Sequence, residues 1–195
     1  MKRGFSLCAI VIAAGAVPAQ QSRPIVGSPP VEPLKGQIHA IADPAPLRSF
    51  RDLCQHADLI VEGVVETVAA RRMPGRNGNI ETDYWIAVNR VIKGPPNTRK
   101  LVTSELGGTF GELQVVMNYP LMQRGERYVL FLYADTYADR RPQIPGLARY
   151  RDDVFYGRYL IDNGKVHLHL PASDNKKYDG MTVEAFASEI AAQLN

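Results

Sequence analysis

The sequence predicts a mainly β domain with a short helix before its first strand and a second helix at its C-terminal end. Residues 59–69 are rich in β-branched types, and apolar side chains alternate on both faces of residues 82–94, so each run is expected to be a strand. Gly63 inside the first run indicates a bulge or a sharp bend, as small barrels need. Asn163-Gly164 is the strongest hairpin signal of the chain.

Both expected helices show apolar residues at helical spacing. Arginine, aspartate and glutamine alternate with the apolar positions of residues 47–57, which predicts a short amphipathic helix leading directly into the first strand. Thr182 is a suitable N-cap for the last helix, whose apolar stripe runs through residues 183–194.

Residues 1–19 have the features of a secretory signal peptide. Lys2 and Arg3 precede an apolar run, and small residues stand before the expected cleavage site after Ala19. The apolar run is too short to span a bilayer as a helix. We therefore expect a secreted or periplasmic protein that keeps no transmembrane segment after cleavage.

The remaining chain is expected to hold a leader and one domain. Residues 20–46 contain six prolines and few large apolar residues, so they are expected to form a flexible, extended leader. Residues 47–195 suit one domain with a sizeable core.

Charge and cysteine content limit the possible partners. The formal net charge is +3, and two of the basic residues belong to the predicted signal, so the exported chain is nearly neutral and a nucleic-acid partner is not expected. Cys8 leaves with the signal, so Cys54 has no partner for an intramolecular disulfide. We expect Cys54 to be a small buried residue, with an intermolecular disulfide or a reactive thiol as alternatives.

A glycine-rich stretch, ELGGTFGELQVV, covers residues 105–116 and raises the question of a phosphate-binding loop. It lacks the lysine and the glycine spacing of such loops, and it continues into a β-branched run instead of a helix. We therefore expect a hairpin or bulged turn that joins strands over 100–106 and 113–119.

The most apolar run, residues 128–133, predicts a central strand, and a long polar stretch follows it over residues 135–153. A loop of this length is typically functional or mobile, so it is either a solvated loop or a contact surface for an anionic partner. The candidate contact residues are Arg140, Arg141, Arg149 and Arg151.

Few residues suggest catalysis. His167 and His169 share one face of an expected strand and are weak candidates for metal ligands, but two ligands do not make a site. The chain lacks a nucleophile elbow, a zinc-protease helix motif and a C-x-x-C pair. We therefore expect no catalytic residue and no cofactor, and the chain is not expected to be an enzyme.

Three short motifs occur in a recognisable order. They are C-x-x-A-D-x-x-x-x-G at residues 54–63, V-I-K-G at 91–94 and G-E-R-Y-V-L-F-L at 125–132. Over residues 47–170 the chain resembles the netrin-like, tissue-inhibitor-of-metalloproteinases-like OB-fold superfamily, and more closely its exported bacterial members of unassigned function. The resemblance implies an OB-like, five-stranded, partly open Greek-key barrel with a helix packed on it.

The inhibitor activity of that superfamily does not carry over to this chain. It depends on a cysteine at the mature N-terminus, held by disulfides, whereas this chain is expected to begin near Gln20 and offers Cys54 no disulfide partner. We expect an exported binding or interaction module, with a protein or a small anionic ligand as its partner. The alternatives are an extracellular protease inhibitor and a metal-dependent hydrolase whose site includes His167, His169 and Glu62.

Overall fold

The computed structural model describes residues 36–42, 49–73, 79–135, 141–142, 144–168 and 173–195. The predicted signal peptide, most of the predicted leader, Arg140 and His169 lie outside the described residues. Within the described ranges, no helix combines the length and the apolar character needed to cross a membrane.

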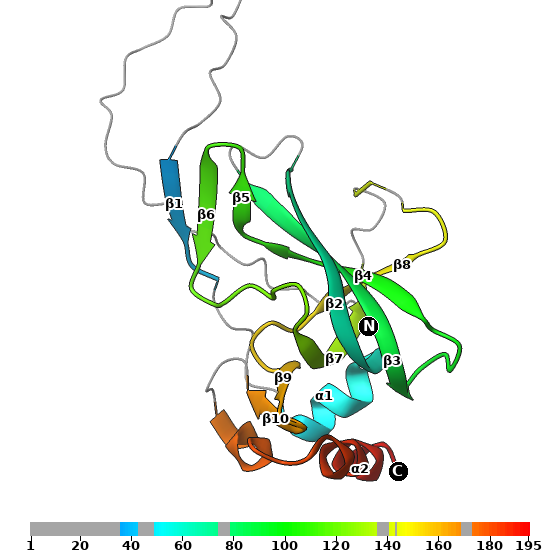
Figure 1. The fold of residues 1–195 in the computed structure, drawn as a ribbon. Coiled ribbons are helices and arrows are strands. Elements are labelled where there is room, and N and C mark those ends of the chain that lie inside the picture. The colour runs from blue at the N-terminus through cyan, green and yellow to red at the C-terminus, as the bar shows by residue number, and fades with distance from the viewer. Residues whose placement is uncertain (1–35, 43–48, 74–78, 136–140, 143, 169–172) are drawn as a thin grey trace, which may run out of the picture.

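Five strands form a closed barrel (Figure 1). They are β2 (Leu59–Arg72), β3 (Ile80–Lys93), β4 (Lys100–Leu106), β7 (Arg127–Ala134) and β8 (Ala148–Asp152). β2 pairs antiparallel with β3 and β7, and β3 pairs antiparallel with β4. β8 closes the ring because it pairs parallel with β4 and antiparallel with β7. A five-stranded barrel of this kind is OB-like, which confirms the predicted fold class, although the ring is closed and not partly open.

The fifth barrel strand, β8, lies inside the polar stretch that the sequence predicts to be a loop. Its sequence is ARYRD, and it has no run of apolar residues. Arg149 points to one face, where Asp83 pairs with it, and Asp152 points to the other, where Arg158 pairs with it. The composition of this strand therefore gives no strand signal, because ion pairs with other strands replace the apolar contacts of an ordinary strand.

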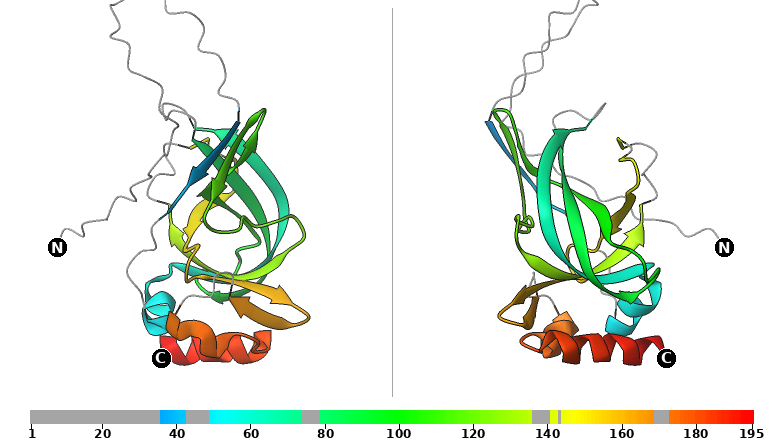
Figure 2. Two further views of the ribbon diagram at one scale, coloured as in Figure 1. Left: turned by 90° about the vertical axis from the view of Figure 1, so that its left-hand side faces the viewer. Right: turned by 45° about the vertical axis from the view of Figure 1, so that its right-hand side comes forward.

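A second, three-stranded sheet lies beside the barrel in the order β1, β6, β5 (Figures 1 and 2). β1 (Gly36–Ala40) pairs parallel with β6 (Leu113–Met117), and β6 pairs antiparallel with β5 (Gly108–Phe110). The sequence places residues 36–40 in a flexible leader and gives no sign of β1. This strand forms because a distant strand, β6, supplies its hydrogen-bonding partner.

The glycine-rich stretch forms a hairpin, as predicted, but the hairpin joins the short strand β5 to β6, whereas the expected partner over residues 100–106, β4, belongs to the barrel sheet. Gly107 and Gly108 have φ values of 108° and 118°, which side-chain-bearing residues rarely adopt. A Cβ atom on Gly108 would overlap the hydroxyl of Thr82. That hydroxyl donates a hydrogen bond of 2.6 Å to the backbone oxygen of Gly107. The glycines therefore allow the hairpin to approach β3 closely.

The remaining elements pack below the barrel (Figure 2). They are α1 (Phe50–His56), β9 (Arg158–Asp162), β10 (Lys165–Leu168), the 3-10 helix η2 (Ser173–Tyr178) and α2 (Val183–Leu194). The Asn163-Gly164 turn joins β9 and β10, with positive φ at both residues, and the Thr182 side chain accepts a hydrogen bond from the Ala185 amide. Both features confirm sequence predictions.

The two helices share an apolar core with the outer wall of the barrel. Phe50, Phe131 and Phe186 pack there with their ring centroids 5.6 to 6.5 Å apart. Cys54 belongs to this core and is fully buried, as expected, and burial raises the pKa of its thiol to about 12. A separate cluster of apolar residues, which includes Val61, fills the barrel.

Lys93, at the end of β3, fixes α1 against the barrel. Its Nζ atom donates to the backbone oxygens of Cys54, Gln55 and Ala57 at 3.0, 2.9 and 2.6 Å. The last carbonyls of a helix lack partners within the helix, and a cation there also interacts favourably with the helix dipole. Lys93 therefore replaces a C-terminal cap and joins α1 to the barrel.

Candidate functional site

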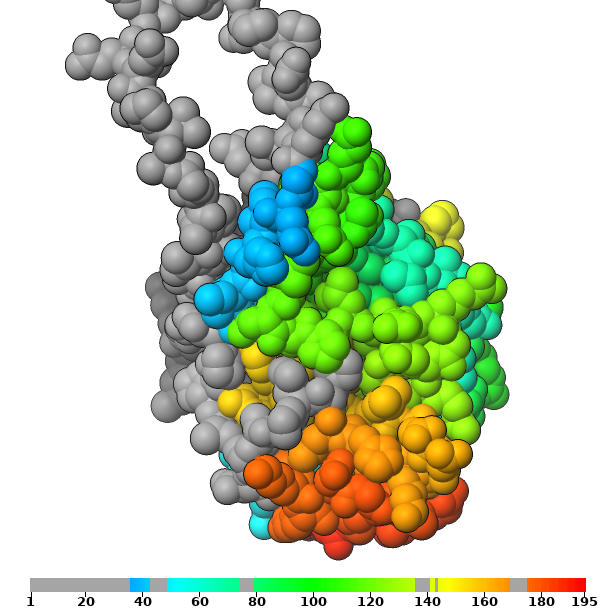
Figure 3. Space-filling model, turned by 60° about the vertical axis from the view of Figure 1, so that its left-hand side comes forward, coloured from blue at the N-terminus to red at the C-terminus, as the bar shows by residue number. Residues whose placement is uncertain are grey.

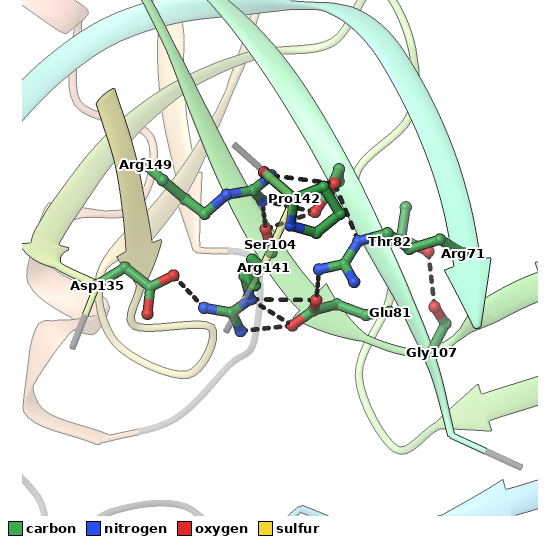
Figure 4. A network of polar contacts seen from close by, with 10 residues as sticks. Arg71, Glu81, Thr82, Ser104, Gly107, Asp135, Arg141, Pro142 and Arg149 are labelled. Atoms are coloured by element: carbon green, nitrogen blue, oxygen red, sulfur yellow. Dashed lines mark hydrogen bonds and ion pairs between the residues drawn. The ribbon is translucent and has the colours of Figure 1, made fainter. Parts of the chain in front are cut away.

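A network of ion pairs and hydrogen bonds lies on the outer face of strands β2, β3, β4 and β8 (Figure 4). Successive side chains of a strand alternate between its two faces. The register pairs Arg71 with Glu81 and Asp83 with Ser104, so these four side chains share the outer face. We call the following set the outer cluster: Arg71, Glu81, Asp83, Ser104, Asp135, Arg141 and Arg149.

Arg141 forms the centre of one half of the outer cluster. Its guanidinium binds Glu81, with Nε at 3.0 and 3.1 Å from the two carboxylate oxygens, and it also pairs with Asp135. Arg71 pairs with the same Glu81 carboxylate. The Arg141 side chain is 13% exposed and the Glu81 side chain 1%. Burial would lower the pKa of Arg141, but hydrogen bonds to Glu81 and Asp135 outweigh it and raise the pKa.

Asp83 forms the centre of the other half. Its Oδ1 atom accepts hydrogen bonds from Arg149 Nη1 at 2.8 Å and from Ser104 Oγ at 2.6 Å. Burial would raise the pKa of Asp83, but these hydrogen bonds and the charges of Arg149 and Arg71 lower it. Arg149 also donates to the Pro142 backbone oxygen at 3.3 Å. The outer cluster thereby ties the β7–β8 connection to the barrel wall.

The structure gives ion-pair partners to two of the arginines proposed as a contact surface. The Arg141 and Arg149 side chains are only 13% and 7% exposed, and both pair with carboxylates of β3, while Arg141 also pairs with Asp135, just after β7. Arg151 lies 5.9 Å from the centre of the Tyr133 ring. Two of the four candidate residues, Arg141 and Arg149, thus belong to the outer cluster, and Arg140 lies outside the described residues. Sequence alone could not reveal this, because Glu81 and Asp83 are distant along the chain.

A second group of charges lies on the opposite face of the same wall, toward the barrel interior. Arg158, from β9, binds Glu105 with 2.8 Å between Nη2 and Oε2, and it binds Asp152 through Nε at 2.9 Å. Burial would lower the pKa of Arg158, but the two carboxylates raise it. Burial and the nearby Asp152 raise the pKa of Glu105, although Arg158 opposes them. This group is sealed from solvent, so its role is structural.

The three histidines that the structure describes do not form a common metal centre with other ligand-type side chains. His167, on β10, lies 3.5 Å from Asp179, and both side chains are largely exposed, at 40% and 51%. His56 Nδ1 lies 2.9 Å from the backbone oxygen of Asp52. Among the residues that the structure describes, no group of three or more His, Cys, Asp or Glu side chains is placed to hold a metal ion. His169 lies outside these residues.

Glu62, the acid considered for a hydrolytic site, is engaged elsewhere. It accepts a hydrogen bond of 2.6 Å from Arg127 on the neighbouring strand β7. The Glu62 side chain is 11% exposed, whereas that of Arg127 is 47% exposed. The contact joins β2 to β7 across two paired strands of the barrel. The arrangement is that of a structural ion pair.

Trp85 is a candidate contact residue that the sequence reasoning missed. It is the one tryptophan of the chain, and its register partners are Thr67 on β2 and Val102 on β4. Trp85 is two positions after Asp83 on β3, so both side chains lie on the outer face. The Trp85 side chain is half-buried. Strand alternation in the sequence could have identified Trp85, since its neighbours Tyr84 and Ile86 point into the barrel and Trp85 must point outward.

The outer face therefore combines a rigid ion-pair network with a partly exposed indole. Such a surface suits contact with a partner better than proton transfer, because its acids and bases already neutralise one another.

Comparison with protein-family models found no family that matches this chain, and comparison with curated proteins found no similar sequence.

Proposed function

We propose that this chain is an exported binding module that contacts a polypeptide partner through the outer face of β3 and β4 around Trp85. The outer cluster is the observation that carries the proposal. Its ion pairs hold the β7–β8 connection on the barrel at the end where β2 meets β3. OB folds bind their ligands at the corresponding strand face and loops. That correspondence is an analogy of fold, and the chemistry of the face must support it.

The charges of this face favour a polypeptide over a small anion. Three arginines and three carboxylates alternate in the outer cluster, so they leave no net positive charge. Recognition of a small anion uses unmatched arginine or lysine donors. A half-buried tryptophan beside fixed polar groups is instead the composition of a protein interface, where tryptophan often dominates the binding energy.

The same contacts favour binding over catalysis. Glu81 and Asp83 are each held by two arginines, and Glu62 is paired with Arg127. A general base must be free to contact the substrate, whereas these three carboxylates are engaged with arginines. No contact of the described residues specifically favours the protease inhibitor or the metal-dependent hydrolase.

Photo-crosslinking tests the proposed face. A benzoylphenylalanine at exposed Thr67, the register neighbour of Trp85, is expected to crosslink one polypeptide in an envelope extract. The same group at exposed Asn163, in the distant β9–β10 turn, is the matched control and is expected to give no such adduct. Absence of an adduct at residue 67, or the same adduct from residue 163, would contradict the proposal.

Affinity for the crosslinked partner then tests Trp85 itself. Trp85→Ala is expected to weaken binding about tenfold to a hundredfold, as truncation of a central aromatic does. Phe110→Ala is the matched control, because Phe110 is 49% exposed and lies on β5, away from this face. Equal losses from both variants would show that the partner does not use the Trp85 face.

Export is tested separately. The mass of the exported protein shows whether the chain is cleaved after Ala19.

A further inference from the structure

Trp85 lies between the closed outer cluster and a row of residues that includes two exposed cations. Arg127, Val64, Ala87 and Lys100 cross β7, β2, β3 and β4 in that order, because the register pairs each of them with the next. Ala87 comes two positions after Trp85 on β3, so this row shares the outer face with the indole. We call these four residues the basic row.

The ends of the basic row are charged, whereas its centre is small and apolar. The Arg127 and Lys100 side chains are 47% and 56% exposed, and Val64 and Ala87 are half-buried. Neighbouring strands of a sheet lie about 4.8 Å apart, so the backbones of the two cations are about 14 Å apart across three strand spacings. The basic row therefore presents an apolar strip between two accessible positive charges, next to Trp85.

The turn before β7 holds one end of the basic row in place. The Gly125 amide donates to the Val65 oxygen at 2.8 Å, and the Val65 amide donates to the Glu126 oxygen at 2.9 Å. Figure 3 shows this turn, in yellow-green, at the surface of the molecule. Arg127 directly follows the turn, so its side chain starts from a fixed position beside Val64.

The acids beside the basic row leave hydrogen-bond donors of its cations unused. Arg127 Nη2 donates to Glu62 Oε1 at 2.6 Å, and Lys100 Nζ donates to Glu66 Oε2 at 2.7 Å. A guanidinium has five N–H donors and an ammonium has three, so each cation keeps donors for a further acceptor. Arg90, the register partner of Glu62, is a third exposed cation. Three cations therefore stand against two acids here, and the Glu62 side chain is only 11% exposed.

We propose that the partner of the Trp85 face is an acidic, extended polypeptide segment, whose carboxylates pair with Arg127 and Lys100 while an apolar side chain between them packs on Val64 and Ala87. This inference rests on the proposed function and adds the chemistry of the partner. Alternate residues of an extended chain project to the same side about 6.8 Å apart, so acids four positions apart span the about 14 Å between the two cations. The expected pattern is an acid, an apolar residue two positions later, and a second acid two positions after that.

Charge complementarity favours an acidic segment over a basic or a neutral one. Accessible cations attract a partner of opposite charge and repel one of like charge. The outer cluster cannot make this selection, because Arg141 and Arg149 are only 13% and 7% exposed and are paired within the cluster. A small anion would pair with the cations but would leave the apolar strip and Trp85 uncovered, whereas a segment covers all of them.

The first experiment uses the fluorescence of Trp85, which is the one tryptophan of the chain. A synthetic peptide, SGESLSEGS, carries the expected pattern and is titrated to millimolar concentration into the full chain without its predicted signal. The emission of Trp85 is expected to change saturably. The matched peptide with lysine in place of both glutamates is expected to cause no change. Raising NaCl from about 0.05 to 0.5 M is expected to weaken binding of the acidic peptide at least about fivefold, because salt screens exposed charges.

Three variants locate the peptide on the basic row. Lys100→Gln combined with Arg127→Gln is expected to weaken peptide binding at least about fivefold, because both charge contacts are lost. Glu66→Gln is expected to strengthen binding about twofold, because Lys100 loses its competing acid, and damage to the fold cannot produce such a gain. Lys165→Gln is the matched control, because Lys165 is exposed on the distant strand β10, and it is expected to leave binding unchanged.

The partner crosslinked at residue 67 provides the second experiment. Its binding is expected to weaken with salt and with the double variant of Lys100 and Arg127. A crosslinked partner that is insensitive to both would overturn this inference and would leave the proposed contact face intact. The inference is also overturned if the acidic peptide causes no saturable change. The same holds if inorganic phosphate or a thymidine octanucleotide causes an equal change at equal concentration, because a small anion or a nucleic acid would then be the ligand.

Discussion

The guanidinium of Arg158 and the carboxylate of Glu105 form an ion pair inside the barrel, with 2.8 Å between Nη2 and Oε2, and neither side chain exposes more than 2% of its surface. Asp152 binds the same guanidinium. Two buried carboxylates therefore depend on one cation. In a region with little water, removal of one member leaves the others unpaired at a large cost in free energy.

Arg158→Met is expected to destabilise the protein strongly. The substitution leaves Glu105 and Asp152 buried without their cation, and loss of one partner of a buried pair costs about 3–5 kcal/mol. Urea denaturation, followed by tryptophan fluorescence, measures the change in the free energy of unfolding. The matched control is Arg127→Met, because the Arg127 side chain is 47% exposed in its pair with Glu62 and its loss should cost about 1 kcal/mol or less. Similar losses in both variants would contradict the structural role assigned to Arg158.

The protonation of Glu105 is expected to make stability depend on pH. Burial and the nearby Asp152 carboxylate raise its pKa in the folded state. A group whose pKa is raised on folding contributes stability that is fully present below the unfolded pKa, about 4.3, and is lost as pH rises through the folded pKa. The parent should therefore lose stability relative to Glu105→Gln, which cannot ionise, as the pH rises from about 4 to 9.

Urea denaturation of both proteins over this pH range measures that difference. The comparison cancels the titration of groups that do not interact with Glu105, which both proteins share. If the difference between the two free energies of unfolding stays constant, or grows in favour of the parent with rising pH, then Glu105 does not carry a raised pKa.

The elements that the sequence predicted correctly are those whose signals are local. The strand run that begins at Leu59, the Asn163-Gly164 turn and the Thr182 cap each depend on residues within a few positions of one another. The burial of Cys54 followed from helical spacing in the same way. The order of such elements, together with short motifs, was sufficient for the fold class.

The elements that could not be predicted from the sequence depend on residues of other strands. β8 has charged residues where a strand usually has apolar ones, and these are stabilised by Asp83 and Arg158 from other strands. β1 lies in a proline-rich region and forms on β6, far along the chain. The ion pair of Arg141 with Glu81 could not be predicted for the same reason, since Glu81 is distant along the chain and meets Arg141 only after folding.

Gly108→Ala is expected to destabilise the β5–β6 hairpin. Gly108 has a φ of 118°, and an added Cβ atom would overlap the Thr82 hydroxyl, so both backbone strain and a clash oppose the substitution. We expect a loss of about 2–4 kcal/mol. Gly111→Ala is the matched control, because Gly111 has a φ of 60° and no atom within 4 Å of the added Cβ, and it should cost only about 1 kcal/mol. Thermal or urea denaturation compares the two, and a larger loss for Gly111→Ala would show that the hairpin does not depend on close approach to Thr82.

Cys54 is expected to be chemically inert in the folded protein. Thiols react as thiolates, and burial raises the pKa of this thiol to about 12, so roughly one molecule in ten thousand carries a thiolate at pH 8. The full chain without its predicted signal should show no reaction with a disulfide reagent at pH 8 and one reactive thiol after unfolding in urea. Gln37→Cys is the matched control, because this exposed position should react rapidly in the folded protein. Rapid labelling of the parent, or a covalent dimer on a non-reducing gel, would show that Cys54 reaches the surface and would restore the alternative of an intermolecular disulfide.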